Sequence, residues 1–177
     1  MRLQHCAVML LGSVAVLLSA QQTMALPDAV VVETRIKEGA LSFQAGMKSR
    51  HTVKIDYSSR SLSSDFLTGV TNLVGIELGS VRDRFTVYSP IFSGEVASFI
   101  MEGQTASAVG VLPNINYRFT ITVDRAAREI VVSGCHDGYP SYSVIVGDTE
   151  VYSFEQEFLA ALFGSCDIVV ASRTVKY

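Results

Sequence analysis

The feature that most constrains the fold is a strict alternation of apolar and polar residues in several short segments. Tyr117–Asp124 and His51–Tyr57 show it most clearly, because every second side chain is apolar and the side chains between are polar. A period of two residues is typical of strands that bury one face in an antiparallel sheet. The alternation therefore predicts a domain built from half-buried strands.

Further strand-like runs recur at short intervals. They are Val30–Ile36, Leu73–Leu78, Arg84–Tyr88, Val96–Met101, Ala106–Leu112, Glu129–Ser133, Tyr142–Val146, Glu150–Phe154 and Ile168–Val175. Turn-forming residues punctuate them, including Gly69, Gly94, Gly103 and Gly147. Many short strands at this spacing are typical of sandwiches and barrels. We therefore predict a mainly β fold, either an antiparallel β-sandwich or a flattened barrel.

One short C-terminal helix is also expected. Ser153 and Gln156 have the spacing of a capping box, in which each side chain bonds the other residue's backbone amide. Apolar residues follow at helical spacing, namely Phe158, Leu159 and Leu162. Gly164 suits the left-handed residue that ends a helix.

The serine-rich segment Ser58–Ser64 is expected to be a surface loop. Serine favours turns, and nothing within this segment would activate a serine as a nucleophile.

Residues 1–25 have the three parts of a secretory signal peptide. Arg2 lies in a short positive region, Cys6–Leu18 is apolar and uncharged, and small residues precede the expected cleavage after Ala25. Cleavage after Ala20 is the alternative. The apolar run is shorter than the roughly 20 residues that span a bilayer. We expect one β-rich domain over residues 26–177, secreted or periplasmic, with no membrane span after cleavage.

The charge balance and the motif content exclude several function classes. The formal net charge is −3, and removal of the signal segment with its arginine makes it one unit more negative. An acidic chain has no overall electrostatic footprint for nucleic acid or an anionic membrane. The sequence contains no nucleophile elbow, phosphate loop, dinucleotide fingerprint or zinc-type spacing. We therefore expect no cofactor and no metal.

Two cysteines, Cys135 and Cys166, remain after signal cleavage. An even number of cysteines in an exported chain favours a disulfide, because export removes the reducing environment. The alternative is a pair of separate buried thiols.

The densest polar cluster is Ser133–Tyr142, which contains His136, Asp137, Tyr139 and Tyr142. A histidine beside a carboxylate can shuttle protons near neutral pH, and His51 is the other histidine of the mature chain. Neighbouring residues on a strand point to opposite faces, however. The structural interpretation is that Asp137 and the following glycine make a turn while His136 bonds a backbone carbonyl. Tyr139 and Tyr142 are candidate binding residues.

This cluster, together with the strand around Val151–Phe154, resembles a group of secreted bacterial β-rich proteins of uncharacterised function. Their signature is Gly-x-His-Asp-Gly-aromatic-Pro-small-aromatic, and the resemblance covers roughly residues 115–170. It implies that this turn matters to the fold or to a site, and it implies no activity, substrate or catalytic residue.

Two function classes follow. The first is a non-catalytic secreted module that binds an extracellular or periplasmic ligand or protein through loops at one end of the sandwich. The second is a small hydrolase that uses His136 and Asp137, with His51 as a further candidate. The first is favoured because the sequence lacks a recognisable nucleophile–base arrangement. Convergence of both histidines and a carboxylate in an open cleft would favour the hydrolase.

Overall fold

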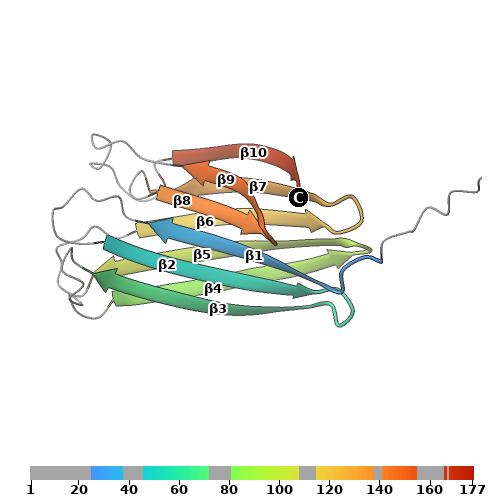
Figure 1. Cartoon of the computed structure of the whole chain (residues 1–177), viewed down its shortest axis with the longest axis horizontal. Helices are drawn as coiled ribbons and strands as arrows, with labels where there is room; N and C mark the ends of the chain where they lie inside the picture. The colour runs from blue at the N-terminus through green and yellow to red at the C-terminus, as the bar shows by residue number, and fades with distance from the viewer. Residues whose placement is uncertain are drawn as a thin grey trace, which may run out of the picture.

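The computed structural model describes residues 25–37, 46–71, 81–107, 115–137, 141–154, 166 and 168–177. These residues form a mainly β domain of ten strands, and none of them lies in a helix (Figure 1). The strands are β1 (Ala29–Lys37), β2 (Gly46–Asp56), β3 (Ser61–Thr71), β4 (Val81–Ser93), β5 (Val96–Ser107), β6 (Ile115–Asp124), β7 (Glu129–His136), β8 (Ser141–Val146), β9 (Thr149–Phe154) and β10 (Ile168–Lys176). Within this described part no helix is long and apolar enough to cross a membrane.

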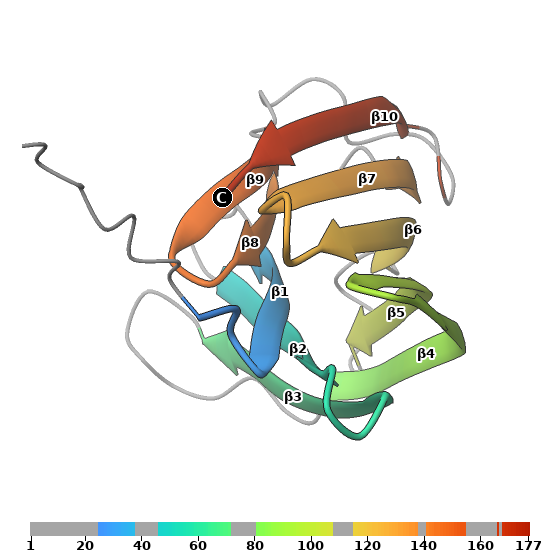
Figure 2. The same cartoon turned by 90° about the vertical axis from the view of Figure 1, so that its right-hand side faces the viewer.

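The strands form two five-stranded antiparallel sheets packed as a sandwich (Figure 2). The first sheet has the order β3-β2-β1-β8-β9, and the second has the order β10-β7-β6-β5-β4. The predicted β-sandwich is therefore confirmed.

The core lies between the two sheets and follows the alternation of the sequence. On β6 the side chains of Tyr117, Phe119, Ile121 and Val123 are all buried. Val32 of β1 and Val53 of β2 are register partners and are buried from the first sheet. Burial of these apolar faces supplies most of the free energy that holds the two sheets together.

The two ends of the sandwich differ in how the chain turns. At one end, which we call the turn end, short turns at residues 57–60, 94–95, 125–128 and 147–148 join neighbouring strands of the same sheet. The chain passes between the sheets from β3 to β4, from β7 to β8 and from β9 to β10. These passages all leave from and return to the opposite end, which we call the crossover end (Figure 1). The connections from β1 to β2 and from β5 to β6 join strand ends there as well.

Two sequence interpretations need correction. The serine-rich segment is a loop only as far as Arg60; Ser61–Ser64 begin β3, an exposed edge strand that pairs with β2 alone. Its alternation is weak because an edge strand buries little of either face. Gly69 and Gly103 lie inside strands rather than at turns. Gly94 and Gly147 do occupy turns with positive φ.

Several expectations fall on residues that the structure does not describe. The signal segment lies outside the described residues except for Ala25. The same holds for the strand expected over Leu73–Leu78 and for most of that over Ala106–Leu112. Of the expected C-terminal helix, only Ser153 and the residue after it are described, and both belong to β9.

Candidate functional site

The His-Asp segment lies at the crossover end, where β7 stops. His136 ends β7, and its side chain is 0% exposed. Its Nδ1 donates to the backbone carbonyl of Asp137 over 2.7 Å, and its Nε2 lies 2.9 Å from the hydroxyl of Tyr152 on β9. A neutral ring with these partners has the proton on Nδ1, and Nε2 accepts from the tyrosine. Burial raises the pKa of Tyr152, which keeps its hydroxyl protonated as the donor.

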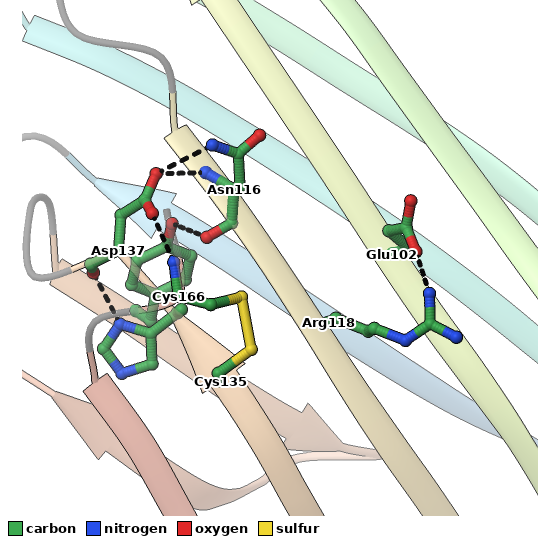
Figure 3. The surroundings of a disulfide bond; sticks show 8 residues. Glu102, Asn116, Arg118, Cys135, Asp137 and Cys166 are labelled. Carbon is green, nitrogen blue, oxygen red and sulfur yellow. Dashed lines mark hydrogen bonds and ion pairs between the residues drawn. A yellow bond between two sulfur atoms is a disulfide. The ribbon is translucent and has the colours of Figure 1, made fainter. Parts of the chain in front are cut away.

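Asp137 ties together three parts of the second sheet (Figure 3). Its Oδ2 accepts from the backbone and side-chain amides of Asn116, at 2.6 and 3.1 Å, and its Oδ1 accepts from the backbone amide of Cys166 at 2.8 Å. Its own backbone amide donates to the carbonyl of Asn116 at 2.9 Å. The carboxylate therefore joins the start of β6, the end of β7 and the residues that precede β10. Its exposed fraction is 4%.

The predicted disulfide between Cys135 and Cys166 is present in the structure, with 4.8 Å between the two Cα atoms. It lies beside the Asp137 carboxylate, since Cys166 takes part in both (Figure 3). Cys166 has a φ of 59°, a conformation that a non-glycine residue seldom adopts. The disulfide and the hydrogen bond from the Cys166 amide to the Asp137 carboxylate hold the backbone of Cys166 close to the point where β10 begins to pair with β7.

A second buried polar cluster surrounds His51 of β2. The imidazole is 0% exposed and stacks on Phe85 of β4, with 4.6 Å between ring centroids and 12° between planes. Its Nδ1 lies 2.5 Å from the hydroxyl of Tyr117, and its Nε2 lies 3.3 Å from the hydroxyl of Ser49. The Tyr117 hydroxyl also lies 2.9 Å from that of Thr34. The cluster therefore joins β1 and β2 of the first sheet to β4 and β6 of the second.

Gly103 makes room for this cluster. A Cβ atom at Gly103 would lie 2.2 Å from Cε1 of Tyr117 and 2.9 Å from Cε1 of His51. Such distances are far below van der Waals contact, so only glycine lets the two rings occupy this space.

A row of ring contacts connects the two histidines. His51 contacts Tyr117, with 5.6 Å between centroids, and Tyr117 contacts Tyr142 at 5.9 Å. Tyr142 contacts His136 at 4.4 Å. Two tyrosine rings thus lie between the histidines, and both imidazoles are sealed within the sandwich.

The structure brings together some of the residues singled out in the sequence. His136, Asp137, Tyr142 and the two cysteines form one cluster, whereas His51 belongs to the neighbouring one. Tyr142 is 1% exposed, and its hydroxyl donates to the carbonyl of Asn116 over 3.1 Å. Tyr139 lies outside the described residues.

Sequence reasoning missed the partners that complete these clusters, namely Asn116, Tyr117 as a hydrogen-bonding group, and Tyr152. Tyr117 and Tyr152 both occupy positions on the apolar face of a strand. The alternation therefore did not indicate that their hydroxyl groups form hydrogen bonds with residues of the opposite sheet. A glycine at an inward position of a strand, as at Gly103, was the one available signal, since it marks a close approach by another side chain.

No protein-family model matches this sequence, and no curated protein matches it either. Among the residues that the structure describes, no group of three or more histidine, cysteine, aspartate or glutamate side chains is placed to hold a metal ion.

Proposed function

We propose that this chain is a secreted, non-catalytic binding module, and that it binds an extracellular or periplasmic ligand or protein through its crossover end. The observation that carries the proposal is the asymmetry of the two ends. Short turns close one end, whereas every passage between the sheets and every longer connection belongs to the other. Binding sites in β-sandwiches commonly lie on connections that a rigid pair of sheets supports at one end.

The buried clusters supply the rigidity that such an end requires. The disulfide, the Asp137 carboxylate and the hydrogen bonds of His136 fix the start of β6, the ends of β7 and β9 and the residues that precede β10. The His51 cluster does the same for β1, β2, β4 and β6. A site on a preorganised end binds with a smaller loss of conformational entropy.

The surroundings of the two histidines give less support to the hydrolase. A general base needs access to a substrate proton, whereas both imidazoles are sealed inside the sandwich. The Asp137 carboxylate faces Asn116 and Cys166, and it is the Asp137 backbone carbonyl that holds His136. These contacts are typical of a structural brace.

The resemblance of Ser133–Tyr142 to secreted bacterial proteins and the signal-like residues 1–25 favour an exported protein. An intact-mass measurement on the exported pool tests this part of the proposal. We expect a mature chain that begins at Leu26, or at Gln21 if the earlier site is used. A full-length chain beginning at Met1 in that pool would refute it.

A panel experiment tests where ligands bind. The mature protein is probed against polysaccharides, glycans, lipid vesicles and extracellular proteins, and each ligand found is measured again with two variants. In the first, residues 38–45 at the crossover end are replaced by a Gly/Ser segment of equal length. In the control, Gly147-Asp148 at the turn end is replaced by Asn-Gly, which suits a two-residue hairpin.

We expect binding to fall at least tenfold in the crossover-end variant and to stay unchanged in the control. A ligand that both variants bind equally would place the site elsewhere and refute the proposal. Turnover of chromogenic ester, amide or glycoside substrates that is lost in His136→Gln but kept in the turn-end variant would favour the hydrolase.

A further inference from the structure

The four edge strands of the sandwich differ in how their outer edges are protected. They are β3 and β9 in the first sheet and β10 and β4 in the second. An exposed edge offers unpaired backbone groups to a strand of another chain, and proteins commonly interrupt such edges with bulges, prolines or charged side chains. Three of these four strands contain an interruption, and β3 does not.

The pairing of each of the other three edge strands is irregular. In β4 the register shifts between Tyr88 and Ile91, where Pro90 has no amide to donate. In β10 it shifts between Val170 and Arg173. The strand β9 is six residues long, and its pairing with β8 also shifts. Because a bulge bends its strand and leaves residues unpaired, a second chain cannot continue a regular ladder along these edges.

The edge of β3 is long, regular and open. Figure 1 shows β3 as the outermost strand of the first sheet, beside β2. It pairs with β2 through eleven successive residues without a register shift, and it contains one charged residue, Asp65, and no proline. Phe66 and Leu67 point to opposite faces of the sheet and are 51% and 62% exposed. The described residues therefore leave both sides of this edge uncovered.

The backbone groups of β3 face β2 and the open edge in turn. The Tyr57 amide donates to the Asp28 carbonyl, which continues the register of β1 and β2 by one pair. Odd-numbered residues of β2 therefore bond β1, and even-numbered residues bond their odd-numbered partners on β3. The even-numbered residues of β3 face outward, and they are Leu62, Ser64, Phe66, Thr68 and Val70. In agreement with this, the Phe66 amide donates to the side chain of Asp65 at 2.8 Å.

We propose that β3 pairs with β3 of a second copy of this chain, antiparallel about a two-fold axis at Phe66. Phe66 is the midpoint of Ser61–Thr71, so this register pairs the whole strand and leaves no overhang. Every outward-facing residue then meets another outward-facing residue, as the hydrogen-bonded pairs of an antiparallel ladder require. The pairing uses both β3 edges, so the assembly closes as a dimer instead of growing into a fibre.

The side chains of β3 suit the same register. Asp65 lies opposite Leu67 of the second copy and not opposite its own counterpart, which avoids a pair of like charges. The Phe66 amide exchanges its bond with Asp65 for one with the carbonyl of the other Phe66. Pairing also removes the exposed apolar surface of Phe66 and Leu67 from water. A strand of another protein would need a matching sequence, whereas a second copy supplies this match by symmetry.

Sedimentation equilibrium of the mature protein over a wide concentration range tests the proposal. Leu67→Glu places a carboxylate opposite Asp65 of the second copy, while within its own chain it faces Arg50 of β2. The control, Ile91→Glu, makes the same change at a 65% exposed residue of the β4 edge. Leu67→Lys reverses the charge opposite Asp65. Ser64→Pro removes an outward amide without removing a bond to β2. Circular dichroism and a thermal melt check that each variant is folded.

We expect the wild-type protein to sediment with twice the mass of the monomer and to dissociate on dilution. Leu67→Glu and Ser64→Pro should weaken the dimer at least tenfold, while Ile91→Glu dimerises as the wild type does. Leu67→Lys should dimerise at least as tightly as the wild type. Hydrogen exchange of the Ser64 and Phe66 amides should be at least tenfold slower in the dimer than in the diluted protein, because those amides face the second copy.

A wild type that stays monomeric at every concentration would overturn the proposal. So would a dimer that Leu67→Glu and Ile91→Glu weaken equally, or one in which the Ser64 and Phe66 amides exchange as fast as in the monomer, because another surface would then hold it. Capture of an extended peptide that protects these amides in a monomeric protein would make β3 a docking edge for other proteins and exclude the second copy. These outcomes do not depend on whether ligands bind at the crossover end.

Discussion

Substitution of Gly103 by alanine gives the sharpest test of the packing at the crossover end, because two physical arguments predict opposite signs. Gly103 lies in β5 and its φ is not in the left-handed region. Alanine at such a position usually stabilises a protein by about 0.4–1 kcal/mol, since it restricts the unfolded chain. The new Cβ atom, however, would lie 2.2 Å from the Tyr117 ring.

The ring of Tyr117 cannot move aside without loss. It is buried, it stacks near Phe119 with 5.2 Å between centroids, and its hydroxyl lies within hydrogen-bond distance of Thr34 and His51. Overpacking of a core costs about 1–3 kcal/mol, and each buried hydrogen bond that is disturbed costs about 1 kcal/mol more. We therefore expect Gly103→Ala to destabilise the domain by about 3–5 kcal/mol, which is roughly 6–20 °C in Tm for a domain of this size.

Urea and thermal melts of the mature protein, followed by circular dichroism, measure this change. Gly147→Ala is the matched control: its Cβ would meet nothing within 4 Å, so only its φ of 57° carries a cost, about 1–2 kcal/mol. Combining Gly103→Ala with Tyr117→Leu should cost less than the sum of the two, because the leucine relieves the overlap. A stabilising Gly103→Ala, or strictly additive costs in the double variant, would refute the reasoning.

Other predictions concern the disulfide, two tyrosines and one turn. Reduction of the Cys135–Cys166 disulfide, which closes a loop of 31 residues, should lower the free energy of unfolding by about 3–4 kcal/mol in the chain-entropy model. Thiol labelling of the denatured, unreduced mature protein should detect no free cysteine. Tyr152→Phe should destabilise the domain by about 1–3 kcal/mol, because it leaves a buried imidazole nitrogen without its donor. Tyr177→Phe should be neutral or stabilising, because that hydroxyl is buried with no partner among the described residues; equal losses in the two variants would contradict both expectations. Hydrogen bonds from Ser59 and Ser58 lower the pKa of Asp56 to about 2. The ionised Asp56 carboxylate therefore stabilises the fold fully above its ordinary pKa near 4, and this stabilisation is lost as the pH falls toward 2. Asp56→Asn should therefore lose less stability than the wild type between pH 4 and pH 2, and identical pH profiles would show that the turn does not depend on the carboxylate.

The fold was predictable because its information is local. Each inward side chain of β6 and β2 follows the alternation from Tyr117 to Val123 and from His51 to Ile55. Burial of one sheet face requires this pattern wherever a strand lies in the sandwich interior. The edge strand β3 escaped the prediction for the same reason. Within Ser61–Ser64 only Leu62 packs against the core and the three serines are exposed, so the segment is too polar to show an alternating signal.

The disulfide was predictable from chemistry rather than from spacing. Of the three cysteines, only Cys135 and Cys166 lie outside the expected signal segment, which leaves one intramolecular pairing. The structure contains this disulfide. The bond from Asp137 to the backbone of Cys166 was not predictable, because it depends on the start of β10 lying beside the end of β7.

The candidate site was only partly predictable because its partners come from strands far apart in the sequence. His136 and Asp137 are adjacent, which suggested a catalytic pair, but the strand sends the imidazole into the core and the carboxylate toward Asn116. Their partners, Asn116 and Tyr152, lie on β6 and β9 and meet them only through the order of strands in the two sheets.

Net charge carries no information about how charges are placed in space. It is a sum over the chain, whereas the potential at a surface depends on which charges lie close together. Arg35 and Arg50 are separated by a connection in the sequence, and only the antiparallel register of β1 and β2 places them side by side with Glu33 between them. The acidic composition therefore describes the protein as a whole, while the register of β1 and β2 determines which charges meet on the outer face of the first sheet.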